Sequence, residues 1–205
     1  MRNIFKASLL LACGVVSSAL TPSQARANAA LELTSGASDI IVQDNTAGLD
    51  LNMASGQIIW AGTINGWTFT VTVGDTKPFL GSATSPHMDL SVTANAPGNG
   101  PLVVKFTDTD FGPTSGSLSS SFFQNGTSTA TTQVLVDPNN GQFVGSPAGT
   151  ANLTGPYSIT LVDSFSVGTV SADHRVVTVP DGGTTAALLG FSVIGLAGLR
   201  RKLTP

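Results

Sequence analysis

The sequence predicts an all-β protein whose central part is a single, jelly-roll-like β-sandwich. Apolar and polar residues alternate with a period of two over many short stretches, and few stretches have a helical period. Thr, Ser, Gly and Asn interrupt the chain about every dozen residues, as turns between short strands do. Eleven of the twelve acidic residues are Asp, which favours turns over helices.

The strand prediction is clearest for the hairpin at 57–64 and 67–73. Asn-Gly at positions 65 and 66 favours a type I′ turn. Folding the chain there places Trp60 opposite Val71 and Gly62 opposite Phe69 on the core face, where the glycine leaves room for the phenylalanine ring. Residues 168–173 are predicted as a turn. The complete set of predicted strands is 31–34, 40–43, 57–64, 67–73, 88–93, 102–107, 117–123, 131–136, 157–165 and 175–179.

Residues 1–27 are predicted to be a secretory signal peptide. A positively charged amino end precedes an apolar stretch and a run of small residues, with cleavage sites after Ala27 and Ala29. A lipoprotein site at Cys13 is the alternative. Because Cys13 is the only cysteine, a chain that has lost the signal peptide has no disulfide and no thiol nucleophile.

Residues 28–178 are predicted to be the exported domain. From residue 28 to residue 181 the chain holds twelve acidic residues and three basic ones, a net charge of −9. This charge argues against nucleic acid or an anionic membrane surface as its partner. It is typical of a soluble exported domain.

Residues 179–205 contain a second apolar segment. No charged residue interrupts 182–199, and Arg200, Arg201 and Lys202 follow. As a helix this run would extend about 27 Å, against a hydrocarbon core of about 30 Å. The basic cluster is expected on the cytoplasmic side. The pattern predicts a transmembrane helix with its carboxyl end inside.

Immediately before this segment stand Val179, Pro180, Asp181, Gly182 and Gly183. A Pro-acid-Gly turn, an apolar run and a basic cluster at the carboxyl end resemble the PEP-CTERM class of sorting signals, in the variant that reads Val-Pro-Asp-Gly/Ser-Gly. The resemblance implies export through the inner membrane and processing by an exosortase, a membrane cysteine transpeptidase, at or beside Pro180. The alternative from the span and charges alone is a one-pass anchor that is never cut.

The resemblance extends less specifically into the body, through residues 62–67, 76–78 and 85–90. It implies an all-β exported domain at the cell surface or outside the cell, in a Gram-negative-type bacterium that makes extracellular polysaccharide, as in a biofilm. We therefore expect a non-enzymatic structural or adhesive role. The alternative is a carbohydrate-binding module, for which Tyr157, Phe79 and Phe122 are the available aromatic residues.

Two sets of residues have side chains suited to chemistry. Asp108 and Asp110 lie two apart near a strand end, so both carboxylates can face one way and bind Ca²⁺; exposed turn aspartates are the alternative. Asp39, Asp44 and Asp50 offer a similar set in the first loop.

The two histidines, His87 and His174, each have an acidic residue close by in the chain. Neighbouring residues of a strand point to opposite faces, however, and the sequence has no Gly-x-Ser-x-Gly motif. A hydrolase built on either histidine is therefore the third hypothesis, behind the structural role and the carbohydrate-binding module.

Overall fold

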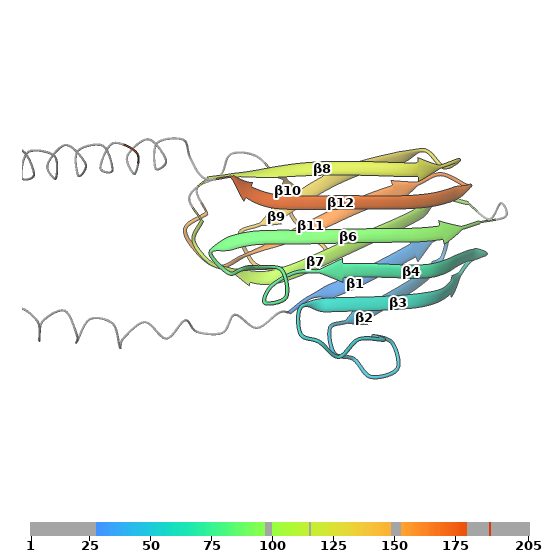
Figure 1. Ribbon diagram of the computed structural model, residues 1–205, viewed down its shortest axis with the longest axis horizontal. Helices are drawn as coiled ribbons and strands as arrows, with labels where there is room; N and C mark the ends of the chain where they lie inside the picture. The colour runs from blue at the N-terminus through green and yellow to red at the C-terminus, as the bar shows by residue number, and fades with distance from the viewer. Residues whose placement is uncertain (1–27, 97–99, 115, 149–152, 180–188, 190–205) are drawn as a thin grey trace, which may run out of the picture.

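The computed structural model describes residues 28–96, 100–114, 116–148, 153–179 and 189. The described residues form twelve antiparallel β-strands in two layers, which confirms the all-β class (Figure 1). The predicted signal peptide and, apart from Leu189, residues 180–205 lie outside the described residues, so the predicted transmembrane helix does too. Within the described ranges, no helix has the length and apolar character needed to cross a membrane.

Two sheets of a sandwich carry all the strands. The strand order is β10-β9-β11-β7-β1-β2 in the first sheet and β3-β4-β6-β12-β8 in the second, with β5 paired to β6. The first sheet contains β10 (Ser146–Pro147), β9 (Ala130–Asp137), β11 (Tyr157–Phe165), β7 (Leu102–Phe111), β1 (Ala30–Ser35) and β2 (Ser38–Gln43). The second contains β3 (Gln57–Ile64), β4 (Trp67–Asp75), β6 (Ser85–Asn95), β12 (Thr169–Val179) and β8 (Ser117–Gly126), besides β5 (Gly81–Ser82).

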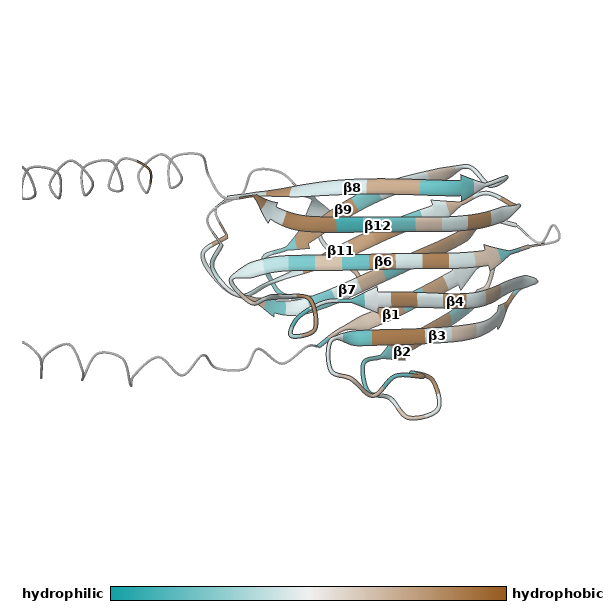
Figure 2. Cartoon of the chain, viewed as in Figure 1, coloured by the Kyte–Doolittle hydropathy of each residue, from teal (hydrophilic) through white to brown (hydrophobic). Residues whose placement is uncertain are grey.

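The hydrophobic core lies between the two sheets and is built from alternate residues of the strands. Buried residues alternate with more exposed ones along the whole of β6, and apolar and polar residues alternate along the same strand in Figure 2. Trp67, Phe106, Phe111 and Phe165 are among the largest side chains that are completely buried. Removing such apolar surface from water is the main favourable contribution to folding.

Each of the ten predicted strands overlaps an observed one, and the prediction missed only the two-residue strands β5 and β10. The predicted turn at 168–173 is wrong beyond its first residue. β12 begins at Thr169 and pairs with Asn95 of β6 from that residue on. Its first half, Thr-Val-Ser-Ala-Asp, is polar at alternate positions because those side chains face outward, which resembles a turn composition.

The hairpin of β3 and β4 has the predicted turn and, next to the turn, the predicted register. Asn65 and Gly66 both have positive φ, at 45° and 85°, as a type I′ turn requires. Farther from the turn a β-bulge in β4 shifts the register, so Trp60 lies opposite Thr72 and the prediction of Val71 was wrong.

The bulge also changes which residues of β4 face the core. Val71 is 37% exposed and Thr72 is completely buried. Gly62 does lie opposite Phe69, but the ring that occupies the free space is that of Trp60, since a Cβ at Gly62 would stand 2.7 Å from it. The rings of Trp60 and Phe69 pack edge to face with their centroids 5.1 Å apart.

Candidate functional site

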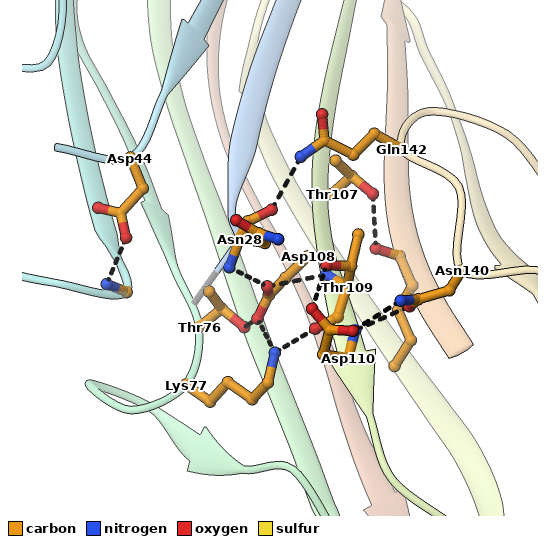
Figure 3. A network of polar contacts seen from close by, with 12 residues as sticks. Asn28, Asp44, Thr76, Lys77, Thr107, Asp108, Thr109, Asp110, Asn140 and Gln142 are labelled. Carbon is orange, nitrogen blue, oxygen red and sulfur yellow. Dashed lines mark hydrogen bonds and ion pairs between the residues drawn. The ribbon is translucent and has the colours of Figure 1, made fainter. Parts of the chain in front are cut away.

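A buried polar centre lies at the end of β7, around the carboxylate of Asp108, which is completely buried (Figure 3). Its Oδ2 accepts hydrogen bonds from Nζ of Lys77, at 2.7 Å, and from the hydroxyl of Thr76, at 2.8 Å. Its Oδ1 accepts bonds from the backbone N–H groups of Thr109, at 2.8 Å, and Asn28, at 3.0 Å. Four donors therefore satisfy one buried carboxylate.

Lys77 joins the two sheets at this centre, because it follows β4 of one sheet and reaches Asp108 of the other. Its side chain is completely buried; Nζ also donates to the carbonyl oxygen of Thr109 and lies 4.2 Å from the ring centroid of Phe111. Burial raises the pKa of the Asp108 carboxyl, and the charge and hydrogen bonds of Lys77 oppose this rise.

The structure separates Asp108 from Asp110, the pair predicted to bind Ca²⁺. The register of β7 with β11 shifts near Tyr157, and Asp110 has a positive φ of 60°. This irregularity turns Asp110 outward, where its carboxylate accepts bonds from Asn140 Nδ2, at 2.7 Å, and the Thr109 hydroxyl, at 2.9 Å. Asp108 is not an exposed turn residue, so that alternative is wrong for it.

Calcium binding at this pair stays a prediction. The Lys77 ammonium already provides the positive charge next to Asp108. Across the described part of the chain, no three side chains of His, Cys, Asp or Glu gather in a way that would hold a metal ion.

Two aspartates of the first-loop set, Asp44 and Asp50, hold the backbone of the loop. Asp50 is buried and accepts bonds from the N–H groups of Asn45, Asn52 and Ile59. Asp44 accepts one from the N–H of Gly56, and Asp39 accepts a bond from the Thr34 hydroxyl. These contacts are typical of carboxylates that fix turns.

A second polar cluster crosses the core between the sheets and contains His174 of β12. Its Nδ1 lies 2.6 Å from Oδ1 of Asp163 on β11, and its Nε2 lies 3.3 Å from the hydroxyl of Ser120 on β8. His174 and Asp163 are completely buried, and the ring of Phe122 packs edge to face on His174. Burial raises the pKa of the Asp163 carboxyl, and His174 opposes this rise through its hydrogen bond and charge.

The order Ser120–His174–Asp163 is that of a serine, a base and an acid that orients the base. If Asp163 accepts the Nδ1 proton of a neutral His174, Nε2 is left to accept the Ser120 proton. The same contacts also tie the two sheets together without any chemistry. Sequence reasoning paired His174 with Asp173 and missed Asp163. The signal was available, because Asp163 shares the inward-facing positions of Leu161 and Phe165 in its strand.

The other sequence candidates lie apart from both clusters. His87 is half-buried on β6, where its Nε2 has no hydrogen-bond partner in the described residues. Tyr157 is completely covered by the core and donates to the Thr114 hydroxyl, so it offers no platform for a sugar ring. Phe79 is 56% exposed and Phe123, which the sequence analysis did not single out, is 70% exposed.

Two small adjacent pockets open where β8 faces β9 and β10. Their volumes are about 260 and 250 Å³, and they share Leu118 and Pro147 as lining residues. Ser120 lines the second pocket beside Val134 and Val176. Each is slightly smaller than typical small-molecule sites, which measure roughly 300–1,000 Å³.

The carboxyl end of the domain leads directly from a strand into the predicted sorting motif. β12 pairs with β8 as far as Val179 opposite Ser117, and Thr178 donates a hydrogen bond to the carbonyl oxygen of Pro86. Residues 178–203 match the VPDSG-CTERM motif. The chain carries a PEP-CTERM-type sorting signal. No curated protein matches the chain.

The sorting signal indicates an exported protein that is processed at the membrane by an exosortase-type enzyme. Of the predicted motif positions, Val179 is described and 43% exposed. Pro180, Asp181, Gly182 and Gly183 lie outside the described residues, as does the basic cluster Arg200, Arg201 and Lys202.

Proposed function

We propose that the protein is a structural or adhesive component of the cell surface or extracellular matrix, delivered there by exosortase processing at or beside Pro180. The observation that carries the proposal is the VPDSG-CTERM motif at 178–203, which follows the folded domain without a spacer. The acidic sandwich is then the part that remains outside the cell. Extracellular polysaccharide is its proposed partner.

The mass of the intact protein from its native cells and medium tests this proposal. We expect a released or surface-attached species that ends around Pro180. Replacing Arg200, Arg201 and Lys202 together by Gln should remove the charges that keep the carboxyl end on the cytoplasmic side, and so reduce processing. A mature species that keeps residues 200–205 and stays with the membranes would contradict the proposal.

The proposed role is non-enzymatic, and Ser120 provides its sharpest test. The hydrogen bond between His174 and Asp163 joins the two sheets. This structural role is a sufficient reason for two buried polar side chains to face each other. We expect a fluorophosphonate probe to leave the Ser120 hydroxyl unmodified, with the Ser120→Ala protein as the matched blank. Labelling of Ser120 that disappears in His174→Gln would instead establish an activated serine.

A carbohydrate-binding module is the second candidate, and exposed aromatic side chains favour it. Phe123 projects from β8 with 70% of its surface exposed, and Phe79 is 56% exposed. Aromatic faces of this kind stack on sugar rings. Binding on a glycan array that is lost in Phe123→Ala but kept in Val167→Ala, a control at another exposed apolar residue, would favour this function over the purely structural one.

A further inference from the structure

We infer that signal-peptide cleavage occurs between Ala27 and Asn28, and that the new α-ammonium group of Asn28 forms an ion pair with the buried carboxylate of Asp108. Cleavage thereby adds a charged contact that the uncleaved chain lacks. The inference rests on export, which the sorting signal indicates, and not on how the tail is processed.

The backbone nitrogen of Asn28 already stands at the required place. It lies 3.0 Å from Oδ1 of Asp108, the carboxylate oxygen that Lys77 does not contact (Figure 3). The carbonyl oxygen of Asn28 accepts a hydrogen bond from Gln142 Nε2, at 2.9 Å. Both backbone polar groups of this residue are therefore held, while the residue itself is exposed and leaves room for a chain that starts there.

The two cleavage sites predicted from the sequence differ sharply in this geometry. Cleavage after Ala29 would remove Asn28 and Ala29, and Asp108 would lose one of its four donors. Ala29 is 1% exposed, and its carbonyl oxygen accepts the N–H of Asp44. The new ammonium would then belong to Ala30, which is completely buried between β2 and β7, where a charge loses its hydration.

The charges around Asn28 favour an additional cation. Asp108 and Lys77 form one pair, Asp110 lies beside them in Figure 3, and the Asp44 carboxylate is near enough to Asp108 for the two charges to repel. Hydrolysis of the Ala27–Asn28 peptide bond consumes one water and leaves a carboxyl group on Ala27 and an amino group on Asn28. At neutral pH the carboxyl group has lost its proton and the amino group has gained one. The ammonium keeps an N–H directed at Asp108, and a neutral hydrogen bond becomes a charge-assisted one.

The first experiment is amino-terminal sequencing and mass determination of the exported protein. We expect the chain to begin at Asn28. A chain that begins at Ala30, or one that keeps residues 1–27, would overturn the inference. The carboxyl-terminal mass is read from the same sample, so failure here and failure of the proposed sorting function are distinguished.

The second experiment isolates the charge. A protein that begins at Ala27 keeps an amide N–H at Asn28 but moves the ammonium one residue away. We expect it to melt about 2–4 °C below the protein that begins at Asn28, as a partly exposed ion pair would give. The difference should persist in Asp110→Asn, a control at the neighbouring acid, and vanish in Asp108→Asn.

If Asp108→Asn does not fold, salt supplies the second measurement. At 1 M NaCl the Debye length is about 3 Å, so the difference in melting temperature between the proteins that begin at Asn28 and at Ala27 should shrink. A difference that is absent at low salt would overturn the ion pair.

Discussion

Replacing Asp108 by Asn tests whether the buried centre at the end of β7 stabilises the domain. The substitution keeps an oxygen that can accept the N–H groups of Asn28 and Thr109, but it leaves the Lys77 ammonium buried without a counter-charge. Removing one partner of a buried ion pair costs about 3–5 kcal/mol. A domain of this size has a total stability of roughly 5–15 kcal/mol, so the loss is a large share of it.

Urea denaturation followed by tryptophan fluorescence measures the change, since Trp60 and Trp67 are both buried in the core. We expect the midpoint to fall with an unchanged slope. The matched control is Arg175→Gln, which breaks the pair with Asp89. That pair has an N–O distance of 2.6 Å, against 2.7 Å for Lys77 and Asp108, but the Arg175 side chain is 48% exposed.

An exposed pair contributes less than about 1 kcal/mol. Equal losses in Asp108→Asn and Arg175→Gln would refute the reasoning that burial decides the cost. A loss near zero in Asp108→Asn would refute the assigned pairing of Lys77.

Two further predictions concern single residues of the sandwich. Gly74→Ala should cost about 1–3 kcal/mol in urea denaturation, because the added Cβ would stand 2.6 Å from the buried ring of Phe106. Gly155→Ala is the control and should be neutral, because no atom lies within 4 Å of the added Cβ. Equal effects of the two substitutions would contradict the packing. Hydrogen bonds from the N–H groups of Asn139 and Gly141 lower the pKa of Asp137, so its stabilisation is present above the ordinary carboxyl pKa and is lost as pH falls through the lower folded value. Asp137→Asn should therefore be less stable than the natural protein by about 1–2 kcal/mol at pH 7. The difference should begin to narrow below about pH 4 and close once the pH has fallen past the lower folded value; a difference that does not narrow with falling pH would contradict this assignment.

Alternation in the sequence was sufficient to locate the strands, because a half-buried strand needs one apolar face. It could not locate the bulges, which insert one residue and exchange the faces beyond it. Val71 and Thr72 show the consequence, since the polar residue is buried and the apolar one exposed. Nothing in Thr-Phe-Thr-Val-Thr-Val at 68–73 distinguishes the regular strand from the bulged one.

The candidate sites were predictable in part. Asp163 occupies an inward position of its predicted strand, so the sequence indicates a buried carboxylate there. Asp108 lies just beyond the predicted strand 102–107, and its burial was not predicted. Their partners were not predictable. Lys77 and His174 reach them from the opposite sheet, and pairings across the two layers depend on how the sheets stack.

The arrangement of the strands relates the two processing events to each other. β1 begins and β12 ends at the same end of the sandwich (Figure 1). The Asp108 centre holds Asn28 there, while Thr178 and Val179 pair with β8 alone after the register with β6 ends at Val177. An exported chain that is attached to the membrane at both predicted apolar segments would therefore have both attachments at one end. We expect the sandwich to fold before either cut is made, with β1 and β12 leading to the two cleavage sites from the same end of it.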